Sequence, residues 1–294
     1  MALSRVVALS ALSLLAVACS AKTSDSSSDP STLGTNEDAL TADNSNSQEA
    51  EDGTEDGIEN GLSGATPADT GGAVDAVDLA ALDAKIKLNP GLYFMPAGCL
   101  VSTRIAAGQW SHVFTNCTGP LGRITYNGTV TSTWTIGAGS FQVVHAATSF
   151  TEAGPNVTVT FGGSRTVTYS RAGAVLSKHR VGSWTGTISK NANPSKTEPW
   201  SHTADFTSTW DGSTKCYTRD GSADNTIGGR EFGRKVTGFK VCGGLFACPT
   251  SGELEVDRKD GSVKIIIDFL GGQNVELTGP RGNTIKTKIA CIAE

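Results

Sequence analysis

Six cysteines in the later part of the chain are the residues whose chemistry the sequence indicates most directly. Their number is even, and in a secreted chain an even set predicts disulfide bonds. Their spacings match no zinc-ligand motif, so we expect three disulfide bonds and neither a metal nor a cofactor. The six are Cys99, Cys117, Cys216, Cys242, Cys248 and Cys291.

Local geometry favours one pairing of these cysteines. The first two bracket a segment that is typical of two strands about a turn at 106–109, which would place them opposite each other and within reach of a disulfide. The fourth and fifth bracket "CGGLFACP", a Gly-rich stretch that would form a tight loop. The predicted bonds are therefore Cys99–Cys117, Cys242–Cys248 and, by elimination, Cys216–Cys291.

Four histidines, His112, His145, His179 and His202, could also do chemistry. They lie on separate segments, and His112 with His202 would be the pair to hold a metal if their strands met. We expect instead that none has a ligand, and we assign no catalytic residue. The chain has no G-x-S-x-G, H-E-x-x-H, C-x-x-C or phosphate-loop motif. A Ser/His/Asp triad assembled from several strands is the alternative, because such triads are recognised by geometry.

The N-terminus carries a secretion signal. One positive residue precedes the apolar run 6–17, about a dozen residues, which is too short to cross a bilayer core of ~30 Å. "AVAC" at 16–19 resembles the lipobox of bacterial lipoproteins. The resemblance implies that residues 1–18 are removed and that Cys19 is acylated and anchors the chain in a membrane. Ser20, by the sorting habit of that family, implies the outer membrane.

Charge divides the rest of the chain. Residues 20–75 carry 13 acidic side chains and one basic one, whereas residues 76–294 carry 22 basic and 16 acidic ones. The segment 19–72 shows no apolar period and no aromatic residue, so we expect a disordered acidic tether. Early aspartates, late lysines and one apolar face predict a short helix at 73–88.

The segment 91–294 alternates apolar residues with Thr and Ser, as in "NVTVTF". This period of two, with Gly-rich turns at short intervals, predicts an all-β domain. Asn127-Gly128 and Asp260-Gly261 are typical hairpin turns. Successive hairpins favour an antiparallel meander that forms a sandwich or a partly closed barrel.

These features predict a lipid-anchored protein of the bacterial cell envelope, periplasmic or surface-exposed, with a structural or ligand-binding β domain that is not an enzyme. Its partners would be the membrane, through the lipid on Cys19, and an anionic envelope polysaccharide or another envelope protein. Its basic residues form no stripe with interleaved aromatics, which argues against nucleic acid. The alternatives are an envelope hydrolase with a site built from several strands, and a carbohydrate-binding surface with exposed aromatic residues. A concave pocket with converging Ser, His and Asp would favour the hydrolase.

Overall fold

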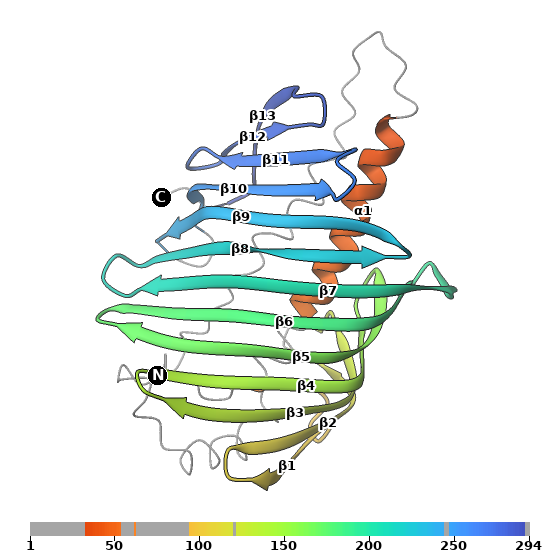
Figure 1. Cartoon of the computed structure of the whole chain (residues 1–294), viewed down its shortest axis with the longest axis vertical. Helices are drawn as coiled ribbons and strands as arrows, with labels where there is room; N and C mark the ends of the chain where they lie inside the picture. The colour runs from red at the N-terminus through yellow and green to blue at the C-terminus, as the bar shows by residue number, and fades with distance from the viewer. Residues whose placement is uncertain (1–32, 54–61, 63–93, 120–121, 244–246, 292–294) are drawn as a thin grey trace.

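The computed structural model describes residues 33–53, 62, 94–119, 122–243 and 247–291, and these form one helix and thirteen strands (Figure 1). The elements are α1 (Leu33–Gly53), β1 (Leu100–Ala106), β2 (Gln109–Thr118), β3 (Thr125–Gly137), β4 (Ser140–Ala153), β5 (Val157–Ala172), β6 (Val175–Lys190), β7 (Asn193–Asp211), β8 (Cys216–Ile227), β9 (Arg230–Cys242), β10 (Pro249–Arg258), β11 (Lys264–Phe269), β12 (Asn274–Thr278) and β13 (Thr284–Lys288).

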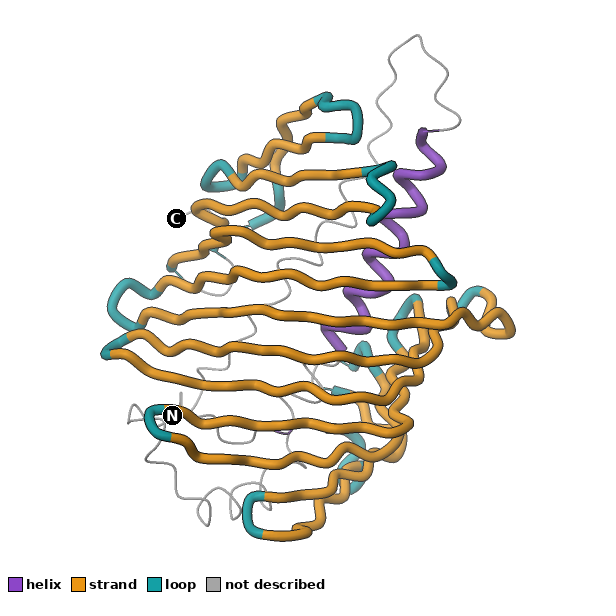
Figure 2. Tube along the Cα trace, in the orientation of Figure 1, coloured by secondary structure: helices purple, strands orange, loops and turns teal. Residues whose placement is uncertain are grey.

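The thirteen strands make a single antiparallel sheet in which each strand lies beside its neighbours in sequence, from β1 at one edge to β13 at the other (Figure 2). Short connections allow only antiparallel pairing, which explains the order. The predicted all-β antiparallel meander is thus confirmed, and it forms one open sheet. Asp260-Gly261 lies in the turn between β10 and β11, as predicted.

The turn predicted at Asn127-Gly128 is wrong. Both residues lie inside β3, where the register with β4 shifts between Asn127 and Val130. Gly128 has a φ of 116°, and a Cβ there would lie 2.7 Å from the carbonyl oxygen of Ser149. A glycine in this conformation is typical of a bulge as well as of a turn, because both need a positive φ and a close backbone approach.

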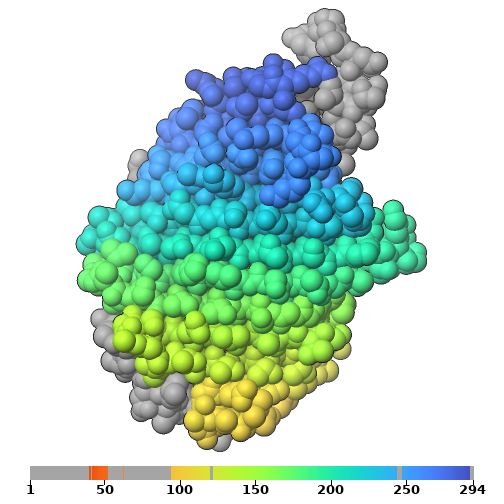
Figure 3. Space-filling view, in the orientation of Figure 1, coloured from red at the N-terminus to blue at the C-terminus, as the bar shows by residue number. Residues whose placement is uncertain are grey.

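Alternation along the strands gives the sheet two different faces. In β5, Val157, Val159 and Phe161 are buried, and Thr158 and Thr160 between them are partly exposed, as predicted. We call the buried side the inner face and the Thr-rich side the outer face. Figure 3 views the outer face, where the strands follow one another in colour order and α1 is hidden behind them.

Helix α1 lies against the inner face, so the prediction of a disordered tether over 19–72 is wrong for residues 33–53 (Figure 1). Leu40 and Ala50 of α1 are buried in the main core cluster with strand residues such as Phe206. Its composition, however, is strongly polar, with Asp and Glu at six of its positions and no Lys or Arg. The rest of the predicted tether, the predicted helix at 73–88 and the signal with Cys19 lie outside the described residues.

All six predicted cysteines form disulfide bonds, but only one predicted pair is correct. Cys99 and Cys117 are joined, with Cα atoms 5.2 Å apart, across the β1–β2 hairpin. The other two bonds correct the predicted Cys242–Cys248 and Cys216–Cys291 pairs. The observed bond Cys216–Cys242 joins directly paired residues of β8 and β9, with Cα atoms 4.1 Å apart. The observed bond Cys248–Cys291 joins the start of β10 to the C-terminal segment, with Cα atoms 5.1 Å apart.

Candidate functional site

Arginine side chains lie on the inner face at positions where the alternation calls for apolar residues. One row of paired residues runs across five strands in the order Arg165, Gly182, Ala204, Ala223 and Arg234. Both arginines in this row are buried. The three residues between them are small, one glycine and two alanines.

Glu51 of α1 presents its carboxylate to buried arginines of this face. Three arginines from β6, β8 and β9 converge on it, and we call Arg180, Arg219 and Arg234 the arginine socket. The Arg180 and Arg219 guanidinium nitrogens donate to Glu51 Oε1 at 2.7 and 3.3 Å, and Arg234 donates to Oε2. All four side chains are at most 5% exposed. Charge-assisted bonds of this kind are the strongest hydrogen bonds that proteins form.

Phe206 of β7 supports the arginine socket from below. Its ring centroid lies 4.3 Å from the guanidinium carbon of Arg219, 5.3 Å from that of Arg180 and 5.5 Å from that of Arg234. An aromatic face attracts a cation by its quadrupole. One ring therefore holds three guanidinium groups in place without neutralising any of them.

Electrostatics keep Glu51 ionised in this buried position. Burial opposes the charged form, but Arg234, Arg180 and Arg219 outweigh it and hold the pKa of the Glu51 carboxyl well below its usual range. One carboxylate therefore faces three fixed positive charges. The arginine socket therefore carries more positive charge than the Glu51 carboxylate neutralises.

A second ion-pair centre lies toward the start of α1. Asp43 accepts hydrogen bonds from Arg230 Nε at 2.9 Å and from Arg258 Nη2 at 3.0 Å. Arg230 also donates to Glu198 at 3.1 Å. These two hydrogen-bonded carboxylates raise the pKa of Arg230 above its ordinary value. Asp43 and Glu51 thus each bind arginines on strands far from α1 in sequence.

A neutral contact lies between the two centres. Ser47 Oγ donates to the side-chain oxygen of Asn225, which also accepts a hydrogen bond from His202 Nδ1 at 2.8 Å. Burial lowers the pKa of His202 to about 4, so its ring is neutral at pH 7. Its ring stacks on Trp200 with centroids 5.9 Å apart.

One further carboxylate of α1 binds backbone groups. Glu49 accepts hydrogen bonds from the backbone N–H groups of Asn156 at 3.0 Å and Val157 at 3.2 Å, at the start of β5. It also accepts one from the Asn156 side chain at 2.7 Å. Carboxylates at three positions of α1 are therefore bound by the sheet, and its docking depends chiefly on charge.

Several buried donors near α1 have no hydrogen-bond partner among the described residues. They include Arg219 Nε and Arg234 Nε in the arginine socket. A buried donor that lacks an acceptor costs about 1–3 kcal/mol. The centre therefore offers more donors than the carboxylates of α1 use.

The histidines of the proposed metal pair lie far apart in the sheet. His112 is on β2 and His202 on β7, with four strands between them. His112 hydrogen-bonds Ser102 at 2.9 Å, and burial with the nearby His145 lowers the pKa of His112 to about 3. His145 bonds Ser132 at 2.8 Å. Within the described ranges, no three His, Cys, Asp or Glu side chains gather to hold a metal ion.

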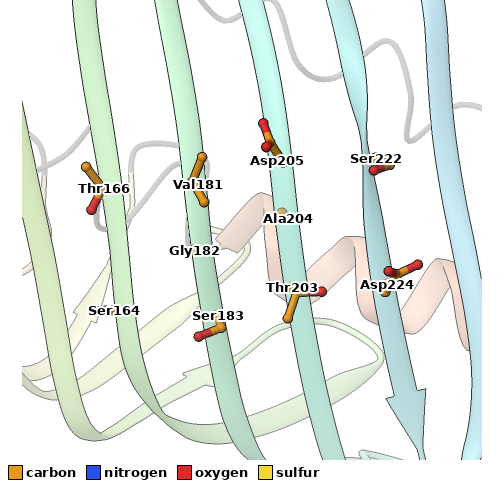
Figure 4. A pocket seen from close by; sticks show the side chains of 10 residues that line it. All are labelled: Ser164, Thr166, Val181, Gly182, Ser183, Thr203, Ala204, Asp205, Ser222 and Asp224. Carbon is orange, nitrogen blue, oxygen red and sulfur yellow. The ribbon is translucent and has the colours of Figure 1, made fainter.

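The outer face has a shallow open depression of about 500 Å³ across β5 to β8. Hydroxyl and carboxylate groups line it, including Ser183, Ser222 and Asp205, and Figure 4 shows α1 on the other side of the strands. His179 Nε2 bonds Asp205 at 2.8 Å. In the part of the chain that the structure describes, no serine hydroxyl is hydrogen-bonded to His179, and the Ser102–His112 and Ser132–His145 contacts lie outside this depression.

The aromatic residues of the carbohydrate alternative lie mostly on the inner face. Trp110, Trp134, Trp184 and Trp200 are buried, and Trp210 is 39% exposed. Sugar stacking needs an accessible ring face, which the four buried rings lack. They belong to the core instead.

Sequence reasoning missed the arginine socket, although a signal for it exists. Arg180 is in phase with Trp184 along β6, Arg219 with Ala223 along β8, and Arg234 with Val236 along β9. A basic residue in the buried phase of a strand needs an acidic partner. The missing acidic partner was α1, which shows no apolar period.

Among the described residues, no helix has the length and apolar composition to cross a membrane. No protein-family model matches the chain, and neither a curated protein nor a solved structure matches it.

Proposed function

We propose that this chain is a lipid-anchored protein of the bacterial envelope whose β domain binds carboxylate-bearing partners and is not an enzyme. The observation that carries the binding function is the arginine socket, in which three guanidinium groups converge on one carboxylate. Arginine presents a planar set of donors that suits carboxylates.

The cost of burying these charges favours a binding role. Replacing a buried ion cluster by apolar residues is often neutral or stabilising, so stability alone does not favour such a cluster. The inner face nevertheless buries arginines on four strands, β5, β6, β8 and β9. An inner face built in this way is suited to receive an acidic group.

The ionisation states favour binding over catalysis. A general acid or base works best with a pKa near the operating pH. The pKa of Glu51 is well below its usual range and that of His202 is about 4, so neither group exchanges a proton readily at neutral pH. The centre therefore acts through fixed charge.

The binding function is tested with poly-L-glutamate as the probe and the full chain as the receptor. Asp43→Asn combined with Glu51→Gln removes the two carboxylates that α1 presents to the arginines, and we call this double variant the open variant. We expect it to bind the probe at least tenfold more tightly than the parent protein, with affinity that falls as salt rises. Calorimetric titration measures this.

A matched control changes the same number of carboxylates elsewhere. Glu231→Gln with Glu253→Gln alters two carboxylates on the outer-face side of β9 and β10 and should leave the affinity unchanged. Adding Arg234→Gln to the open variant should weaken binding at least tenfold. If the open variant shows no binding that depends on Arg234, the proposed binding function is wrong.

The anchor is supported by the "AVAC" sequence and tested separately. Cys19→Ser should abolish incorporation of labelled fatty acid and move the protein from the membrane to the soluble fraction, because the acyl chains supply the membrane affinity. A Cys19→Ser protein that stays with membranes, beside a parent that takes up no label, would contradict the anchor.

A further inference from the structure

The way α1 is seated shows what shape of acidic partner the inner face accepts. Asp43, Ser47 and Glu51 are spaced four residues apart, so they follow one side of the helix. Their partners on the sheet are the Arg230–Arg258 pair, Asn225 and the arginine socket. Two carboxylates eight residues apart on a helix are separated by ~12 Å along its axis. The sheet therefore binds carboxylates at fixed helical positions, which a flexible polyanion does not provide.

Apolar contacts reinforce this selectivity. Leu40 and Ala50 of α1 are buried in the core cluster on the same side of the helix as Asp43 and Glu51. A helix with Leu, Asp, Ser and Glu at these spacings thus fits the sheet, and the same residues rotated by 100° would not. Position on the helix, together with charge, decides the fit.

Helix α1 itself is a weak helix former. It contains residues of low helix propensity, among them Gly34, Asn44 and Asn46, and lacks acidic residues in its first turn and basic residues in its last. Such a segment depends on the sheet for its helical structure, and the cost of ordering it reduces its affinity. A partner helix with better intrinsic propensity could therefore displace it.

We infer that the inner face binds an acidic helix of a second protein and that α1 is the intramolecular occupant which this partner replaces. This inference rests on the proposed binding function and names its partner class. Gly53 and Phe94 are separated by 40 residues of chain. Tethered at this length, α1 competes at an effective concentration of about a millimolar, so only a partner with good complementarity displaces it.

Two labelled peptides test the inference. The first has the sequence 33–53, and the second exchanges Asp43 with Ala42 and Glu51 with Ser45, which keeps composition and net charge but moves both carboxylates away from the side of the helix that faces the sheet. Fluorescence anisotropy measures their binding to the full-length open variant. We expect the first peptide to bind at least tenfold more tightly than the second, and circular dichroism to show helix formation on binding.

The unaltered chain and a second receptor complete the experiment. The unaltered chain should bind the first peptide at least tenfold more weakly than the open variant does, because its own α1 competes. If the open variant fails to fold, Leu40→Asp provides another receptor, since it removes the apolar contact of α1 and leaves the arginines intact.

The outcomes separate this inference from the proposed function. Equal binding of the two peptides, each dependent on Arg234, would overturn the helix partner and leave a general site for polyanions. Equal affinity of the unaltered chain and the open variant for the first peptide would overturn the role of α1 as competitor. Absence of binding by both peptides and by poly-L-glutamate would overturn the proposed function itself.

Discussion

Glu51→Gln is expected to release α1 from the inner face while the sheet stays folded. The change leaves three guanidinium groups of the arginine socket around a neutral amide, and loss of one partner from a buried ion cluster costs about 3–5 kcal/mol. Amide hydrogen exchange within α1 should therefore accelerate by about 100-fold or more, whereas exchange in β5 to β9 should change little. Mass spectrometry of the two regions measures both.

Glu49→Gln is the matched control, because Glu49 is only partly buried and binds backbone N–H groups in place of arginines. Its effect on exchange in α1 should be less than tenfold.

Acid neutralises the Glu51 carboxylate without a mutation. Since the folded-state pKa of Glu51 is depressed, its contribution is present above the ordinary carboxyl pKa and is lost as the pH falls through the lower folded value. Helix α1 should thus stay protected at pH 5, and rapid exchange at that pH would contradict the ion-pair account.

Removal of the Cys248–Cys291 bond has the second large expected effect. This bond closes 43 residues of chain, and the chain-entropy relation gives such a loop a stabilisation of about 4 kcal/mol. Cys248→Ala with Cys291→Ala should lower the free energy of unfolding by about that amount in urea titrations. Hydrogen exchange should rise most in β12 and β13, which include the edge strand of the sheet.

The Cys99→Ala/Cys117→Ala variant provides the comparison for this bond. That pair closes a loop of 18 residues at the opposite edge, so its loss should leave exchange in β12 and β13 unchanged. Peptide mapping without reduction checks the pairing directly. A peptide that joins Cys242 to Cys248 would contradict the connectivity on which the prediction depends.

The sequence predicted what short-range patterns determine. Alternation identified the buried sides of Val157, Val159 and Phe161, because the face of each residue in a strand depends only on its phase. The Cys99–Cys117 bond was predictable for a similar reason, since both residues flank one hairpin. Local rules succeed wherever the partners are close in sequence.

Other features depend on contacts between distant segments. The bond between Cys248 and Cys291 joins the start of β10 to the chain beyond β13, and no local turn brings these residues together. Asn127-Gly128 has the composition of a hairpin turn but lies in a bulge, because its strand pairs with β4 on both sides of a register shift. Composition alone does not separate these two outcomes.

The arginine socket depends both on local strand phase and on a contact between distant segments. Its arginines are visible in sequence as basic residues in the buried phase of strands, but Glu51 lies 129 residues before Arg180, the nearest of them in sequence. The segment around Glu51 has the composition of a disordered tether, and composition does not reveal a partner elsewhere in the chain. Its helical structure depends on a charged surface encoded much later in the chain.

The place of α1 near the N-terminus has a consequence for distance from the membrane. With a lipid on Cys19, as proposed, the 14 residues from Cys19 to Leu33 span at most ~50 Å, so a docked α1 keeps the sheet within that distance of the bilayer surface. Once a partner displaces α1, the connecting segment is the chain from Cys19 to Phe94. Its 75 residues have a maximum length of ~260 Å. Occupancy of the inner face would thereby set how far into the envelope the β domain reaches.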